Sequence, residues 1–115
     1  MKYTGSCHCG QVRFEAEGTL EKVMECNCSH CSRKGYLLWF VPEAQFTLKS
    51  GEDSLNVYTF NKHAIRHQFC TRCGCAPFAA GQDPKGAKVA AINARCLEGV
   101  DLAILPKIPI DGRSF

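Results

Sequence analysis

The sequence predicts a small all-β domain, and three observations lead to that prediction. Glycine and proline divide the 115 residues into short segments, and no apolar stripe at helical spacing continues for a dozen residues. Several segments at close spacing are rich in β-branched and aromatic residues, which is typical of all-β domains. Nine cysteines lie mostly in three tight groups, which favours a small domain stapled by metal ions. We therefore expect residues 1–115 to form a single zinc-binding domain.

Side-chain alternation is clearest in residues 11–18. Val12, Phe14 and Ala16 would share one face of a strand, and the charged residues between them would share the other. One buried and one solvated face are typical of a half-buried strand at the surface of a sheet.

The apolar run at residues 36–41 ends at a proline, which is typical of a buried strand. Trp39 and Phe40 lie within this run, and both are expected in the core. The segment 102–110 contains two prolines and is expected as an edge strand or an extended tail. Further strands are expected at 46–49, 55–60, 64–69 and 88–96, and a single helical turn within 27–35.

No segment of the chain suits a membrane or a secretory pathway. The longest apolar run has six residues, too few to span a bilayer, and the first residues lack the apolar region of a signal peptide. Disulfides belong to oxidising compartments, and nine is an odd number, so a disulfide framework is the minor alternative. We expect a cytoplasmic, metal-binding protein.

The charge of the chain argues against nucleic acid as a partner. The formal net charge is +3. If seven thiolates bind two zinc ions, this charge falls to about zero. The basic residues are also scattered rather than arranged as a stripe. A nucleic-acid-binding zinc ribbon is therefore the weakest of the functional classes.

The first metal constellation joins two distant cysteine pairs. In C-x-x-C-G at 70–74, two thiolates can converge on one ion, while the glycine takes a backbone conformation with positive φ. A tetrahedral site needs two more ligands, and Cys7 and Cys9 are the natural pair. We call Cys7, Cys9, Cys70 and Cys73 the cysteine quartet. It would tie an N-terminal hairpin to the later part of the chain, unless each pair consists of free buried thiols.

The second constellation is local. Cys26, Cys28 and Cys31, the cysteine trio, supply three thiolates within six residues. Three protein ligands and an open position are typical of a catalytic zinc site, and an exogenous thiol could take the open position. The alternative is a closed site whose fourth ligand is His30, His67, Cys75 or Cys96.

These clusters, in this order, resemble the glutathione-dependent formaldehyde-activating enzyme (GFA) family, which includes centromere protein V-like proteins. The resemblance implies coiled antiparallel sheets, a structural zinc at the quartet and a more labile zinc at the trio, near the substrate. It also implies the joining of formaldehyde to glutathione, classed as a carbon–sulfur lyase activity for the reverse direction. Cys75 stands where the family usually has a small hydroxyl residue. The matching stretches are 5–12, 26–33 and 69–74, with further similar residues at 93–97 and 111–112.

The mechanistic hypothesis assigns catalysis to the trio and His30. A thiol held at the trio would attack a small aldehyde, and His30 would protonate the hemithioacetal oxygen. Arg33 and Lys34 could face an anionic group of the substrate. The simpler interpretations are an exposed loop histidine and a solvated charged turn. The alternative function is a non-catalytic, zinc-stabilised module that binds a protein partner.

Overall fold

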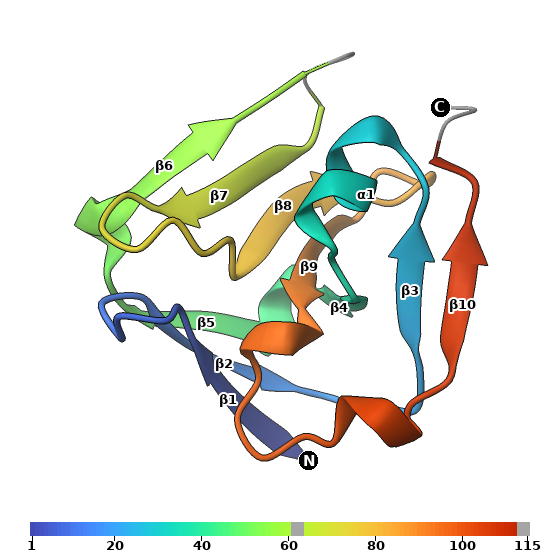
Figure 1. Ribbon diagram of the computed structural model, residues 1–115, viewed down its shortest axis with the longest axis horizontal. Helices are drawn as coiled ribbons and strands as arrows, with labels where there is room; N and C mark the ends of the chain where they lie inside the picture. The colour runs from blue at the N-terminus through green and yellow to red at the C-terminus, as the bar shows by residue number, and fades with distance from the viewer. Residues whose placement is uncertain (61–63, 113–115) are drawn as a thin grey trace.

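Two β-sheets and one short α-helix make up the fold of the computed structural model, which describes residues 1–60 and 64–112 (Figure 1). The three-stranded sheet has the order β1 (Lys2–Ser6), β2 (Arg13–Glu17), β5 (Phe46–Ser50). The seven-stranded sheet has the order β10 (Lys107–Ile110), β3 (Val23–Cys26), β4 (Leu38–Pro42), β9 (Lys88–Asn93), β8 (Phe78–Gln82), β7 (Arg66–Cys70), β6 (Leu55–Tyr58).

The α-helix α1 (Ser29–Lys34) connects β3 to β4 and confirms the expected helical turn. It begins after Cys28, whose sulfur caps its first turn, and ends at Gly35, which has φ of +71°. No helix in the described ranges is long and apolar enough to cross a membrane. Short 3₁₀ turns connect other elements: η1 (Glu43–Gln45), η2 (Glu52–Ser54), η3 (Ala94–Cys96) and η4 (Leu102–Ile104).

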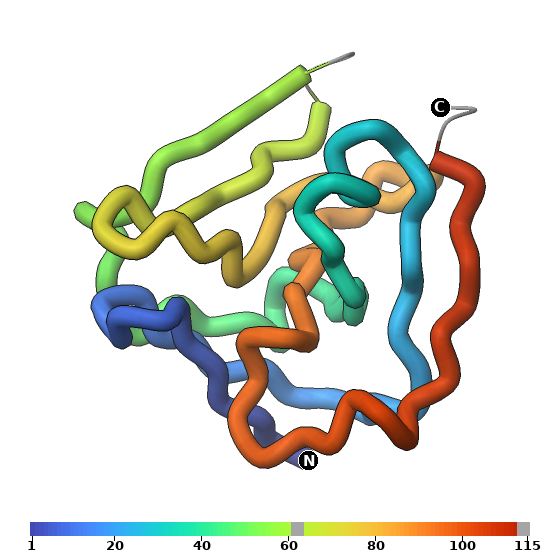
Figure 2. The backbone as a smooth tube through the Cα atoms, viewed as in Figure 1, coloured from blue at the N-terminus to red at the C-terminus, as the bar shows by residue number. Residues whose placement is uncertain are grey.

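Within the described residues, all strand pairs are antiparallel except that of β10 and β3. These two segments lie side by side (Figure 2) and run parallel, with Lys107 opposite Val23 and Ile110 opposite Cys26. The resemblance implied antiparallel sheets, so this pair corrects that expectation. The long connection from β9 leads the chain to the edge of the seven-stranded sheet, where β10 pairs with β3. The two prolines of the segment 102–110 predicted an edge strand here, and the prediction is confirmed. This pairing brings the C-terminal end of β10 next to the cysteine trio.

The main core lies between the two sheets. Phe14 and Ala16 of β2 are buried against Trp39 of β4 and Ile92 of β9. Phe14 and Ala16 are buried together because residues two apart on a strand point to the same face of the sheet. The ring of Phe14 stacks on Phe46 at 5.4 Å between centroids. The predicted alternation in 11–18 is therefore confirmed.

Most of the expected strands are present, with differences at the ends. The segment expected at 88–96 leaves the strand conformation at Asn93, whose side chain caps the 3₁₀ turn η3. Trp39 is in the core, but Phe40 is 44% exposed, which corrects the expectation that it packs inside. Consecutive side chains on a strand point to opposite faces, so both could not enter the same core.

Candidate functional site

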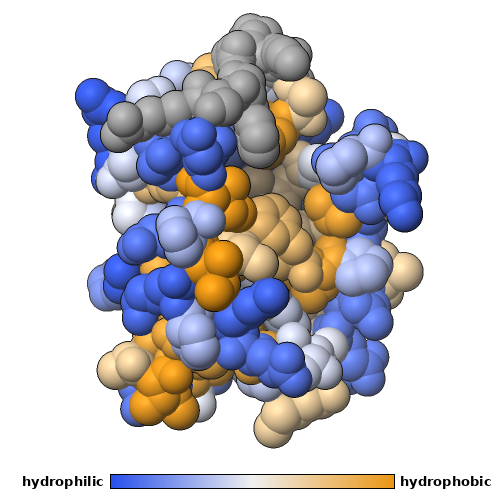
Figure 3. Space-filling view, turned by 90° about the vertical axis from the view of Figure 1, so that its right-hand side faces the viewer, coloured by the Kyte–Doolittle hydropathy of each residue, from blue (hydrophilic) through white to orange (hydrophobic). Residues whose placement is uncertain are grey.

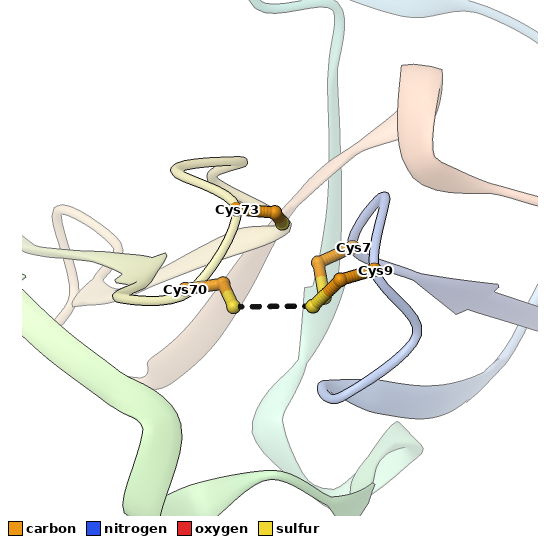
Figure 4. Close-up of side chains that lie close together, drawn as sticks. All are labelled: Cys7, Cys9, Cys70 and Cys73. Atoms are coloured by element: carbon orange, nitrogen blue, oxygen red, sulfur yellow. Dashed lines mark hydrogen bonds between the residues drawn. The ribbon is translucent and has the colours of Figure 1, made fainter.

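The cysteine quartet is assembled from two turns that face each other (Figure 4). Cys7 and Cys9 lie in the turn after β1, while Cys70 ends β7 and Cys73 lies in the turn that follows. The four sulfurs lie within 4.8 Å of one another. The Sγ–Sγ distance is 3.6 Å between Cys7 and Cys9, and 3.7 Å between Cys9 and Cys70.

Both turns use a glycine with positive φ to fold back on themselves. Gly10 has φ of +79° and donates its N–H to the Cys7 carbonyl at 3.2 Å. Gly74 has φ of +81° and donates to the Cys70 carbonyl at 2.8 Å. Glycine adopts this conformation without steric cost, so the predicted role of Gly74 is confirmed. Each turn thereby directs its two sulfurs toward the centre of the quartet.

The quartet fits a tetrahedral zinc ion. A zinc–sulfur bond of about 2.3 Å in tetrahedral geometry places neighbouring sulfurs about 3.8 Å apart, close to the two distances above. All nine cysteines are free thiols, so none of these contacts is a disulfide. Burial raises the pKa of Cys73, but the backbone N–H groups of Cys75 and Cys9 outweigh it and lower the pKa to about 6. The surroundings of Cys73 thus favour the thiolate that a metal requires.

The cysteine trio surrounds the start of α1. Cys26 ends β3, Cys28 is the N-cap of the helix, and Cys31 lies in its first turn. Their sulfurs lie within 4.8 Å of one another. Burial raises the pKa of Cys28, yet the Cys31 N–H, 3.2 Å from its sulfur, contributes to a pKa below the usual range. Burial holds the pKa of Cys31 well above its usual range. Three convergent thiols of this kind are suited to zinc.

No fourth ligand accompanies the trio among the described residues. No described histidine, cysteine, aspartate or glutamate places a ligand atom within 4.8 Å of all three sulfurs. Cys75 is instead close to the quartet, whose Cys73 and Cys7 contribute to raising its pKa. Cys96 is partly buried against the main core, and burial raises its pKa to about 12. The described residues therefore leave the trio open on one side. His63 lies outside the described residues.

Gly112 is a part of the trio site that sequence reasoning did not assign a role. It follows β10, and a Cβ at this position would overlap the sulfur of Cys26 and lie 3.1 Å from the Cβ of Cys28. The segment is held by Asn27, whose backbone N–H donates to the Ile110 carbonyl at 3.1 Å. The Asn27 side-chain amide also donates to Asp111 Oδ1 at 3.1 Å. This contact arises because β10 pairs with β3, and local sequence patterns do not predict that pairing.

A cavity of about 480 Å³ opens beside the trio. All three trio cysteines line it, together with side chains from β4, β7, β8 and β9. Its walls are mostly apolar, and they include the exposed Phe40. Figure 3 shows hydrophobic residues gathered in the middle of one face of the molecule, with hydrophilic residues on both sides. Large apolar cavities with few polar groups are the usual form of small-molecule sites.

Two histidines and several aromatic rings pack together near α1. His67 lines the cavity beside the trio, whereas His30 is not part of that lining and lines a second cavity instead. His30 and His67 have ring centroids 4.3 Å apart, and the Nδ1 atom of each is buried without a hydrogen-bond partner. His67 is only 8% exposed, and burial with the nearby His30 and Lys34 lowers its pKa to about 4. Burial, with Lys34, lowers the pKa of His30 as well. His30 is therefore a half-buried helix residue, which corrects the alternative of an exposed loop histidine.

Arg33 and Lys34 line the second cavity, of about 890 Å³, together with both histidines. Arg33 donates to the Ser29 carbonyl at 2.8 Å, and the Lys34 ammonium lies 5.9 Å from the centre of the Phe69 ring. Neither lines the cavity beside the trio. Both side chains are exposed, as the interpretation of a solvated charged turn predicts.

Comparisons with known proteins agree with this arrangement. A solved protein from Rhodobacter sphaeroides is similar to the chain at 29% sequence identity with a TM-score of 0.81. The match covers 92% of this chain and 97% of that protein. A family model described as glutathione-dependent formaldehyde-activating enzyme matches residues 2–110. The chain therefore belongs to the glutathione-dependent formaldehyde-activating enzyme family, as the three cysteine motifs indicated.

Proposed function

We propose that this chain is a zinc-dependent enzyme that joins a small aldehyde to a thiol and catalyses the reverse carbon–sulfur lyase reaction. The family implies glutathione and formaldehyde as the pair, with S-hydroxymethylglutathione as the adduct. In this proposal Cys26, Cys28 and Cys31 hold a zinc ion at the reaction site. The quartet holds a second, structural zinc ion.

One observation carries the proposal: the trio opens onto a cavity, whereas the quartet already has four ligands. Three thiols and an open position are the arrangement of a catalytic zinc site, and four thiols are that of a structural one. An exogenous thiol that enters the cavity can therefore approach the trio. The same thiol has no open position to take at the quartet.

The chemistry is an addition to a carbonyl group. The thiol gives up its proton, its sulfur forms a bond to the carbonyl carbon, and the C=O π pair moves to the oxygen, which takes a proton. Zinc held by the trio would lower the pKa of the substrate thiol, so that it reacts as a thiolate. The neutral imidazole of His30 would take the proton from the thiol, and the resulting imidazolium would donate it to the oxygen. The apolar walls would keep water away from the reacting atoms.

Calorimetric titration with glutathione tests this proposal. Zinc-loaded wild-type protein should show saturable binding, and Cys28→Ser should abolish it. Cys96→Ser is the matched control, because Cys96 belongs to neither cluster. Formaldehyde is then added, and adduct formation is followed by NMR against the uncatalysed rate in buffer.

The outcomes separate the candidate functions. Binding and accelerated turnover, both lost in Cys28→Ser, would support the enzyme. Thiol binding without acceleration would contradict catalysis, and the absence of thiol binding would favour the non-catalytic, partner-binding module. A cytoplasmic location is part of the proposal, supported by nine unpaired thiols, which persist in reducing compartments.

A further inference from the structure

The C-terminal end of β10 forms part of the trio site without supplying a ligand to it. Ile110 and Gly112 line the same cavity as the three trio cysteines. Gly112 packs so closely on the trio that a Cβ there would overlap the Cys26 sulfur. Close-packed backbone limits where a neighbouring atom can lie. The end of β10 is therefore a wall of the site, and whatever holds this wall also constrains the Cys26 sulfur.

Asn27, which lies between two trio cysteines in the sequence, holds this wall through two hydrogen bonds. Its backbone N–H donates to the Ile110 carbonyl at 3.1 Å, next to the point where Ile110 lies opposite Cys26. Its side-chain amide donates to Asp111 Oδ1, also at 3.1 Å. One residue of the trio loop is thus bonded to two successive residues of the wall. We call the side-chain pair of Asn27 and Asp111 the clamp.

The surroundings of the trio show why its geometry depends on β10. Among the described residues, β3 pairs with β4 only at Met24 and Leu38, whereas all four residues of β3 pair with β10. The helix α1, which carries Cys31, has six residues, and so short a helix is not stable by itself. The loop between β3 and α1 therefore takes its position from its neighbours, and β10 is the most extensive of these.

The clamp acts on the site from outside the cavity. Asn27 and Asp111 are both exposed, and neither belongs to the described lining of the cavity beside the trio. The Asp111 carboxylate is not among the ligand atoms that converge at the trio. The pair is thus placed to orient the ligands rather than to bind the ion or the substrate. Its effect on the site passes through Cys26 and Gly112.

We propose that Asn27 and Asp111 are positioning residues of the trio, because their hydrogen bond holds the end of β10 against Cys26 and keeps the sulfurs spaced for a metal ion. The inference rests on the proposed zinc site at the trio and adds two residues that bind neither metal nor substrate. Removal of residues that orient metal ligands typically lowers metal affinity about ten- to a hundredfold. Because the clamp is exposed to water, we expect an effect of about tenfold.

An exchange of the two side chains tests the clamp. Asn27→Asp places two carboxylates opposite each other, which removes the donor and adds repulsion, so metal affinity at the trio should fall about tenfold. When Asp111→Asn is added, the new amide can donate to the new carboxylate, and the affinity should return to nearly the wild-type value. This double variant has the same net charge as the wild type. Asp111→Asn alone keeps an accepting oxygen and should change the affinity little.

Three measurements separate an effect on the trio from an effect on folding. Competition with a chromophoric chelator gives the zinc affinity of each cluster, and cadmium-113 NMR gives a signature of the geometry at each ion. In Asn27→Asp the trio resonance should move while the quartet resonance stays, and the double variant should restore it. Amide hydrogen exchange of the Asn27 N–H should accelerate in Asp111→Ala, which reports on the wall without a metal. Asn56→Asp, the same change at an exposed position on β6, is the matched control.

The results distinguish this inference from the proposed function. If the wild-type trio binds no metal, the proposed function fails, and the inference that rests on it fails too. If the trio binds metal but Asn27→Asp leaves its affinity and resonance unchanged, only the clamp is overturned. Equal losses at both clusters, or no recovery in the double variant, would also overturn it. Asp111→Ala removes the acceptor without adding a charge, so it should lower the trio affinity even if Asn27→Asp does not fold.

Discussion

The two cysteine clusters differ in where their members come from along the chain, and this difference decides their openness. The quartet combines two turns that are 61 residues apart at Cys9 and Cys70, so its sulfurs approach the centre from opposite sides. The trio comes from six consecutive residues at the start of one helix, so its sulfurs approach from one side. A site built from one side keeps an open position, and a site built from two sides closes.

The same comparison separates stability from function. A zinc ion at the quartet, as proposed, would connect the three-stranded sheet to the turn between β7 and β8 and so support the fold. The thiols of the trio face a cavity, which would support chemistry.

The largest effect is expected from a change in the quartet. Cys70→Ser leaves three ligands at a site where zinc holds two distant turns together, so unfolding should become easier by about 4 kcal/mol or more. Thermal unfolding with a zinc assay measures this loss. Cys96→Ser, outside both clusters, should change stability far less. A Cys70→Ser protein as stable as the wild type would contradict a structural role for the quartet.

The change Cys28→Ser in the trio should affect binding more than folding. Thiol affinity should fall at least about a hundredfold, equivalent to about 3 kcal/mol, because the site loses a ligand. Unfolding free energy should fall by less than about 1 kcal/mol, because serine is itself a favoured N-cap residue and can accept the Cys31 N–H in place of the sulfur. Titration and chemical denaturation on the same sample measure both. A drop in stability as large as that of Cys70→Ser would show that the two clusters are not functionally distinct.

Stability should decrease in acid because of His67. Its pKa is about 4 in the folded protein, below the ordinary value of 6.5, since burial, His30 and Lys34 all disfavour the charged form. The unfolded chain therefore binds the proton more readily below pH 6.5, and stability is lost as the pH falls from 6.5 toward 4. His67 alone should cost about 2 kcal/mol between pH 7 and pH 5.

The control for this prediction uses variants, because acid also weakens metal binding in every form of the protein. His67→Phe should show a shallower loss of stability than the wild type in the same range. His8→Gln changes an exposed histidine and should follow the wild type. Parallel curves for His67→Phe and the wild type would refute the assignment.

The smallest effect is expected at Gly112. Gly112→Ala places a methyl group against the Cys26 sulfur, so metal affinity at the trio should fall about tenfold while the quartet keeps its metal. Gly99→Ala is the control, because it also changes a glycine, here with φ of +69°, but meets no atom within 4 Å. Competition with a chromophoric chelator measures both sites. An unchanged trio affinity in Gly112→Ala would remove Gly112 from the site.

Local patterns in the sequence predicted the strands whose residues show alternation or strong strand preference. Three strands were not predicted. β1 has no alternation of apolar residues, β3 has only four residues, and β8 reads Phe-Ala-Ala-Gly-Gln, which has weak strand preference. Pairing with neighbours in the sheets stabilises all three. These three segments therefore form strands because of their pairing in the sheets, not because of the local strand preference of their residues.

The two cysteine clusters were predictable because their spacing is visible directly in the sequence, and both groups of cysteines converge as expected. The cavity was not predictable in the same way. It depends on which face Phe40 and Ala91 share, and a continuous apolar run does not reveal the face. Gly112 was also hidden, because only the parallel pairing of β10 brings it to Cys26.

Cadmium-113 NMR of the cadmium-substituted protein tests the central claim most directly, because the resonance of each ion reports its own sulfur ligands. We expect two resonances, one from each cluster, and a shift of only one of them when glutathione is added. The shifting resonance should be absent in Cys28→Ser, and the other should persist. A single resonance, or a thiol-induced shift of the resonance that persists in Cys28→Ser, would contradict the division into one closed and one open site.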